Sequence, residues 1–104
     1  MSKSKIYVIK DEGKFNLSGA LEYGDEIIPI FIREIPVWSS TGPYVSQMDA
    51  KLARYMPDDY LLVVGDPVGI FMAGMILDKR GFKKVKLLKW DNRQKAYFPV
   101  IIEI

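Results

Sequence analysis

The stretch Tyr60-Leu61-Leu62-Val63-Val64-Gly65-Asp66-Pro67 decides the fold of this chain. Its first five residues are continuously apolar, as is typical of a strand that is buried on both faces of a sheet. Gly65 favours a tight turn, and Asp66 and Pro67 are residue types preferred at the N-cap and the first position of a helix. The stretch therefore predicts a strand over residues 60–64 that leads directly into a helix over residues 68–80.

The sequence after this stretch predicts two more strands. Lys79, Arg80 and Gly81 are typical of a helix C-terminus. Residues 85–90 then predict a strand, and a strand–helix–strand unit of this length links parallel strands by a right-handed crossover. After a polar turn, residues 97–104 predict a last strand, antiparallel to the one before it. The C-terminal half is thus predicted to be a β-α-β-β unit.

The N-terminal half predicts two strands, over residues 4–10 and 26–34, which are rich in Ile and Val. Between them, Asn16 and Gly24 flank a stretch that suits one or two helical turns, residues 17–23. A second helix is predicted over residues 43–56, where apolar residues recur at helical spacing: Val45, Met48, Leu52 and Tyr55.

Two prolines predict which strands lie at the edges of the sheet. Proline cannot donate a hydrogen bond to a ladder, so Pro29 and Pro99 favour edge strands or bulges. The chain is expected to form one small α/β domain, residues 1–104, with a mixed sheet of four or five strands. The expected core is Ile6, Val8, Ile28, Ile30, Leu52, Leu61, Val63, Ile70, Ala73, Leu77, Val85, Leu87, Val100 and Ile102.

The composition fits one globular domain and removes several classes of chemistry. The 104 residues are 49% apolar and 27% charged, close to the globular average. The absence of cysteine excludes disulfides, thiolate metal sites and a cysteine nucleophile. The absence of histidine removes the commonest metal ligand and general base. A net charge of +2 is too small to imply a nucleic-acid partner by itself.

No targeting or membrane segment is expected. The basic start is followed by four apolar residues, Ile6 to Ile9, whereas a secretory signal needs about seven or more. The longest uncharged apolar run, residues 67–77, has eleven residues, and a span needs about 20. A cytoplasmic protein without a membrane partner is expected, in the host cell cytoplasm if the protein is viral.

The first candidate site is a ligand turn formed by Gly65, Asp66 and Gly69. Ligands bind outside the carboxyl ends of strands in open α/β sheets, and a helix N-terminus suits phosphate. However, Asp66 places a carboxylate where a phosphate would lie, and the turn has no dinucleotide or P-loop glycine pattern. The alternative is that Asp66 only caps the helix. No cofactor is expected.

The second candidate site is a self-association face on the helix over residues 68–77, which is apolar on every side. A small domain buries a limited share of its surface, so a homodimer is expected. The small residues allow another helix to approach closely, and the face is assigned to Gly69, Met72, Ala73 and Ile76. The alternative is that the sheet and the helix over residues 43–56 cover this helix.

The third candidate site is a basic hairpin. Residues 79–104 carry eight basic and two acidic residues, whereas residues 1–78 carry seven basic and eleven acidic residues. Basic groups beside aromatic rings suit a nucleic-acid backbone with stacked bases, or an acidic protein surface. The alternative is a solvated hairpin whose lysines protect an edge strand. The partner-binding residues are expected to be Lys84, Lys86, Trp90, Arg93, Lys95 and Tyr97.

Four aspartates, Asp58, Asp59, Asp66 and Asp91, border the C-terminal strands. Their spacing matches neither a calcium loop nor a two-metal cluster. Adjacent acids before a buried strand are more often turn and capping residues. No catalytic or metal-binding residue is assigned, and an enzyme is not expected.

Several motifs of the C-terminal half occur together: the run over residues 58–67, Val85-Lys86-Leu87-Leu88-Lys89-Trp90-Asp91, Arg93-Gln94 and Tyr97-x-Pro99. In these motifs, residues 58–104 resemble a family of small proteins from tailed, marine podovirus-like bacteriophages. Asn92 makes the Trp-Asp-Arg-Gln run of that family one residue longer here. The resemblance implies a viral or prophage origin, and it carries over no activity.

Three functions therefore stay open from the sequence. The first is a small phage accessory protein that acts without catalysis, binding a host or viral protein or assembling with itself. The second is single-stranded nucleic-acid binding through the basic hairpin. The third is nucleotide or small-ligand binding at the turn of Gly65, Asp66 and Pro67.

Overall fold

The structure is a computed structural model, and it describes residues 4–10, 17–31 and 42–104. The part of the predicted strand over residues 32–34 and the predicted cap Asn16 lie outside the described residues. In chain order the elements are strand β1 (Lys5–Lys10), the 3-10 helix η1 (Leu17–Glu22), β2 (Glu26–Phe31), α1 (Gly42–Leu52), β3 (Tyr60–Leu62), α2 (Pro67–Lys79), β4 (Lys84–Asp91) and β5 (Ala96–Glu103).

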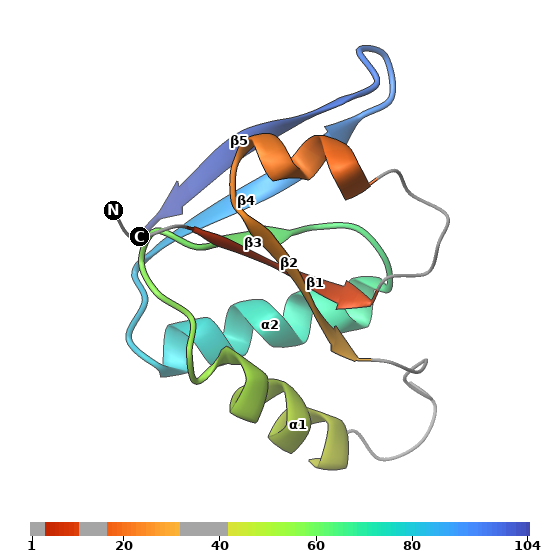
Figure 1. The fold of residues 1–104 in the computed structure, drawn as a ribbon. Helices are drawn as coiled ribbons and strands as arrows, with labels where there is room; N and C mark the ends of the chain where they lie inside the picture. The colour runs from red at the N-terminus through yellow and green to blue at the C-terminus, as the bar shows by residue number, and fades with distance from the viewer. Residues whose placement is uncertain (1–3, 11–16, 32–41) are drawn as a thin grey trace.

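The five strands form one mixed sheet in the order β2-β1-β3-β4-β5 (Figure 1). β1 pairs in parallel with β2 and β3, and β3 pairs in parallel with β4. β5 returns antiparallel to β4 through the turn that follows Asp91. The predicted α/β fold with a C-terminal β-α-β-β unit is confirmed.

The two strands that contain proline lie at the two edges of the sheet, as predicted. On β5, the Ile104 amide donates to the Lys83 carbonyl over 2.8 Å, so even-numbered residues turn their amides toward β4 in the alternating antiparallel ladder. Pro99, opposite Leu88 in the register, therefore holds an outward position. Its missing N–H removes a donor from the free edge and costs the ladder nothing.

The helices cover one face of the sheet and η1 covers the other (Figure 1). On the helix side, Leu61 from β3 and Leu77 from α2 are almost completely buried in one apolar cluster. The rest of that cluster's buried residues are Tyr7, Ile9, Ile30, Phe31, Met48, Leu52, Tyr55, Met72, Ala73 and Ile76. On the η1 side, a second cluster contains Ile6, Val8, Ala20, Leu62, Val64, Leu88 and Tyr97. The sheet is thus buried on both faces at its centre.

The core differs from the predicted one mainly on the hairpin. Ile102 was expected inside but is 47% exposed, because β5 is the edge strand and α2 does not cover it. Val85 and Leu87 are half-buried against the helix-side cluster, as predicted. Leu88, on the other face of β4, is completely buried in the η1-side cluster.

The predicted helix over residues 43–56 ends earlier, at Leu52. The Tyr55 amide donates to the Leu52 carbonyl over 3.0 Å, which turns the chain inward. The Tyr55 ring is then buried, and its hydroxyl donates to the Asp59 carbonyl over 3.0 Å. A helix continued to Met56 would not make this turn.

Candidate functional site

The strand–helix turn places α2 over the sheet. Gly65 has φ +104°, in the left-handed region that favours glycine. The Asp66 carboxylate accepts a hydrogen bond from the Val68 amide over 3.1 Å, and Pro67 begins the helix. Asp66 is therefore an N-cap, as predicted, and its carboxylate occupies the position that an anionic ligand needs. Gly69, the third residue of the predicted ligand turn, lies in the first turn of α2 and is buried.

The face of α2 that was assigned to self-association lies inside the chain. Gly69, Met72, Ala73 and Ile76 are all buried, against the sheet and α1. These residues are not available to a second molecule, and this assignment is corrected. The predicted alternative, in which the sheet and the neighbouring helix cover α2, describes this side of the helix.

The opposite side of α2 remains apolar and exposed. Val68 is 41% exposed, Phe71 71% and Met75 61%. At about 100° per residue, these three residues and Gly74 fall on the side of the helix that is turned away from the buried residues, and exposed Asp78 continues that side at the C-terminal end. We call Val68, Phe71, Gly74 and Met75 the outward face of α2.

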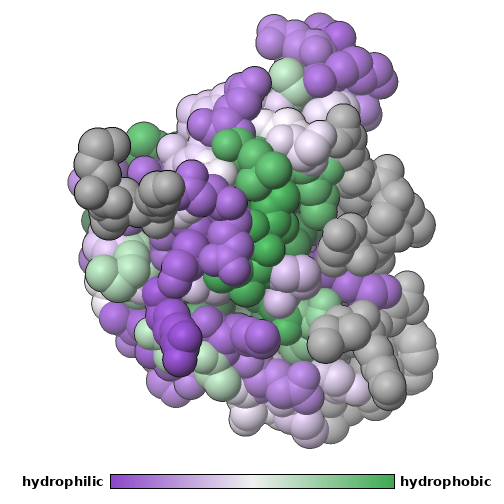
Figure 2. Space-filling view, viewed as in Figure 1, coloured by the Kyte–Doolittle hydropathy of each residue, from purple (hydrophilic) through white to green (hydrophobic). Residues whose placement is uncertain are grey.

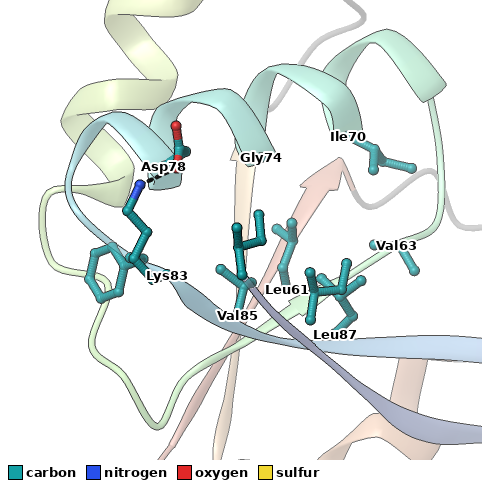
Figure 3. A pocket seen from close by; sticks show the side chains of 11 residues that line it. Leu61, Val63, Ile70, Gly74, Asp78, Lys83, Val85 and Leu87 are labelled. Carbon is teal, nitrogen blue, oxygen red and sulfur yellow. Dashed lines mark hydrogen bonds and ion pairs between the residues drawn. The ribbon is translucent and has the colours of Figure 1, made fainter.

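A pocket of about 250 Å³ borders the outward face on the side of β5. Figure 3 shows Leu61, Val85 and Leu87 pointing from the sheet toward α2, and Gly74 lies at the edge of the helix that borders this space. A Cβ atom placed on Gly74 would have no neighbour within 4 Å. Ile102 and Ile104 line the pocket on its β5 side. We call this hollow the Gly74 pocket.

A second pocket of about 250 Å³ borders the outward face on the side of α1, lined by Val45, Met72, Met75, Ile76 and Lys79. The outward face thus has an apolar hollow on each flank. Protruding Phe71 lies between these hollows by helical geometry. Such a continuous apolar surface is typical of a binding site for another protein.

Charged residues flank this surface at its ends. Asp66 stands at the N-terminus of α2, and Lys79 lies in its last turn. Asp78 accepts from Lys83 over 2.8 Å (Figure 3). Arg80 forms an ion pair with Asp49 of α1, with 2.9 Å between Nε and Oδ1. The last pair joins the two helices away from the outward face.

The basic hairpin does not gather its cations in one place. Lys84 and Lys86 lie near the start of β4, and Arg93 and Lys95 lie in the turn after its end. A strand advances about 3.3 Å per residue, so about 20 Å separates the two pairs. The hairpin tip projects from the body (Figure 1) and is hydrophilic (Figure 2). The expectation of one shared basic surface is therefore corrected to two separate basic regions.

The aromatic residues of the predicted hairpin site, Trp90 and Tyr97, pack against each other. Tyr97 is 4% exposed, and its ring centroid lies 4.9 Å from that of Trp90 in an edge-on contact. The Trp90 indole N–H donates to the Asn92 side chain over 3.0 Å. Lys86 places its ammonium 4.5 Å from the centre of the Tyr60 ring. Tyr97 is thus part of the η1-side core and not an exposed platform for a base.

The four aspartates are separate turn and capping groups. Asp59 is 3% exposed, and its two carboxylate oxygens accept from the Lys5 and Met56 amides, each over 2.8 Å. Asp91 accepts from the Arg93 amide over 2.9 Å within the hairpin turn. Among residues 4–10, 17–31 and 42–104, no group of acidic side chains is arranged to hold a metal ion.

Two buried tyrosines, Tyr7 and Tyr55, lie near Asp59. Burial raises the pKa of Tyr55 well above its usual range, and the negative charge of Asp59 raises it further. Burial, followed by the same charge, also raises the pKa of Tyr7, whose ring centroid lies 5.6 Å from that of Tyr55. Burial alone raises the pKa of Tyr97. These hydroxyls therefore stay protonated in the folded state, where they support packing.

Sequence reasoning found α2 but missed which side of it is exposed. Phe71 and Met75 are the most exposed apolar residues of the outward face. The sequence analysis assigned neither of them to a site. The available signal was the covering helix: once α1 and the sheet are placed against Met72, Ile76 and Ala73, the remaining side of α2 must face solvent. Periodicity could not supply it, because a helix that is apolar all round has no polar side to mark the surface.

In the described part of the chain, no helix has the length and apolar character that a membrane crossing requires.

Comparisons with known proteins agree with the bacteriophage resemblance. No curated protein and no solved structure matched the chain. A protein-family model described as Phage Pam3 gp32-like protein matches residues 4–104. This match confirms a phage protein family and extends the likeness from the C-terminal half to nearly the whole chain. The chain belongs to the Phage Pam3 gp32-like protein family.

Proposed function

We propose that this phage protein is a non-enzymatic interaction module that binds another protein through the outward face of α2. The observation that carries the proposal is Phe71, a large aromatic residue that is 71% exposed at the centre of an apolar surface. Large apolar patches on monomers commonly mark interaction sites. Aromatic residues are also enriched among those that dominate binding energy.

The two flanking hollows support a protein partner. Each measures about 250 Å³ and is lined mainly by aliphatic side chains. Such hollows suit the side chains of a second apolar surface. Lys79 and the Asp78–Lys83 pair lie at the margin, where protein interfaces are commonly polar.

A nucleotide or small ligand at the strand–helix turn is less well supported. The Asp66 carboxylate caps the helix, and Gly69 is buried. A phosphate at this position would meet a negative charge in place of free amides. The geometry of the turn is accounted for by its role in starting α2.

A capture experiment tests the proposal. The purified chain serves as bait in lysate from cells infected by the phage, beside a Phe71→Ser, Met75→Ser variant. The matched control is Met56→Ser, because Met56 is 60% exposed but lies outside α2. We expect wild type and control to retain the same phage or host protein and the α2 variant to lose it. Equal retention by all three chains would refute the proposal.

Nucleic-acid binding through the hairpin remains a second candidate, supported by the exposed Arg93 and Lys95 at the projecting tip (Figure 1). Binding to phosphates weakens steeply with salt. Replacing the exposed Lys84, Arg93 and Lys95 by Ser is expected to leave the melting temperature nearly unchanged, because surface substitutions cost little. Lys86 is kept, because it is half-buried against the Tyr60 ring. If the chain binds single strands, this variant loses affinity and its salt dependence flattens. An unchanged salt slope would remove the candidate.

A further inference from the structure

We infer that the outward face of α2 binds the same face of a second copy of this chain, with the two α2 helices antiparallel across a two-fold axis. The inference rests on the proposed function and names its partner. Two features of α2 support this inference. The first is that the Phe71 ring projects from the helix near the Gly74 pocket. The second is that Asp66 and Lys79 place opposite charges at the two ends of the helix.

The ring and the hollow are complementary to each other. Phe71 projects into solvent, and Gly74 leaves the space of the Gly74 pocket unfilled. A two-fold axis that passes between the two helices, level with the midpoint of Met72 and Ala73, sets Phe71 of one copy at the level of Gly74 of the other. The same contact then forms twice, as symmetric dimers require. The absent side chain at Gly74 also allows the helices to approach closely.

The charges at the ends of α2 fit the same register. With the axis level with the midpoint of Met72 and Ala73, Lys79 of one copy comes to the level of Asp66 of the other. Asp78, beside Lys79, is paired with Lys83 of its own chain over 2.8 Å. α2 spans 13 residues, or about 20 Å, so both ends take part in one contact. Antiparallel packing also sets the helix dipoles in opposite directions. A parallel arrangement would instead bring Asp66 to Asp66 and Lys79 to Lys79.

The flanks enlarge the contact beyond the helix itself. Val45 of α1 is 38% exposed beside Met75 in one hollow, and Ile102 borders the other. A contact of one short helix with its margins is small, and small interfaces form weak complexes. The dimer is therefore expected to dissociate on dilution, with both states present at micromolar concentrations.

Sedimentation equilibrium tests the inference with three variants and two matched controls. Phe71→Ser removes the ring, and Gly74→Leu fills the hollow without introducing a poor helix former. Lys79→Glu sets two acidic groups against each other. The controls are Ala50→Leu and Lys51→Glu on α1, since Ala50 is exposed and Lys51, like Lys79, lies in the last turn of its helix. Circular dichroism establishes that each variant is folded.

Wild type and both controls are expected to show a mass near twice 11.9 kDa at about 100 μM. Phe71→Ser and Gly74→Leu should weaken the dimer by at least about tenfold, and Lys79→Glu by a smaller factor. A monomeric wild type at that concentration would overturn the inference, as would a dimer that all three α2 variants leave unchanged.

The same preparations separate this inference from the proposed function. If wild type is monomeric but Phe71→Ser still abolishes capture of a phage or host protein, the second copy is the wrong partner and the proposed function stands. If wild type is monomeric and no partner depends on Phe71, both are refuted.

Discussion

α1 and α2 lie on the same face of the sheet, but their solvent sides differ. The exposed residues of α1 include Ser46, Gln47 and Lys51, whereas those of α2 include Phe71 and Met75. Both helices bury their other sides in one apolar cluster. The solvent side of α1 is thus mainly polar, whereas α2 leaves large apolar side chains exposed to solvent. This contrast is the observation from which we propose an interaction surface on α2.

The largest expected difference within α2 is between its two sides. Leu77 is completely buried, so Leu77→Ala should lower the free energy of unfolding by about 2–5 kcal/mol. Phe71→Ser should change the free energy of unfolding of the monomer by about 0.5 kcal/mol or less, because Phe71 is exposed. Urea titrations at low micromolar protein concentration measure both. Comparable losses would show that Phe71 packs within its own chain and would remove the contrast between the two sides.

Removing the N-cap should have the next largest effect. Asp66→Ala leaves the Val68 amide without its acceptor and should lower the free energy of unfolding by about 0.5–2 kcal/mol. Asp66→Asn should be nearly neutral, because an amide oxygen also caps. Thermal unfolding of the three chains provides the comparison. If Asp66→Asn retained full stability but lost a binding activity, the turn would have a ligand role in addition to capping.

Alkaline pH should lower the free energy of unfolding through the buried Tyr55, which follows α1 in the chain. The pKa of Tyr55 is raised in the folded state, so stability is complete below the ordinary tyrosine value of about 10. It falls as pH rises above that value, because the unfolded chain releases the proton first. Tyr55→Phe should cost about 1 kcal/mol at neutral pH through the lost hydrogen bond to Asp59.

The same variant should lose less stability than wild type between neutral pH and pH values above the ordinary tyrosine pKa. Urea titrations across that range measure the difference. A parallel decline in both chains would assign the alkaline sensitivity to Tyr7 or Tyr97 instead, whose pKa values burial also raises.

Much of the fold could be predicted because local signals and long-range pairing agree. Asp66, Pro67 and Gly81 mark both ends of α2. Pro29 and Pro99 mark the two edge strands, since a missing N–H is tolerated only where no ladder bond is lost. These residues act on the backbone of their own segment, Asp66 through its carboxylate and the prolines through their missing N–H, so they can be interpreted without knowledge of distant neighbours.

The candidate site was less predictable, because the exposure of its residues depends on which helices and strands pack against α2 and the β4–β5 hairpin. Leu88 and Tyr97 are buried by η1 and β1, which are distant in sequence from the hairpin. The uniformly apolar α2 gives no indication of which side α1 covers. The basic residues were grouped by sequence proximity, but an extended strand separates Lys84 from Lys95 along its length.

One measurement tests the central claim without any substitution. Met75 and Met56 are 61% and 60% exposed, but only Met75 lies on the outward face of α2. With the methionine methyl groups labelled with carbon-13, NMR spectra are recorded as the protein is diluted from the high to the low micromolar range. We expect the Met75 methyl signal to shift with concentration and the Met56 signal to stay constant. A Met75 signal that is independent of concentration, or a shift confined to Met56, would contradict the account.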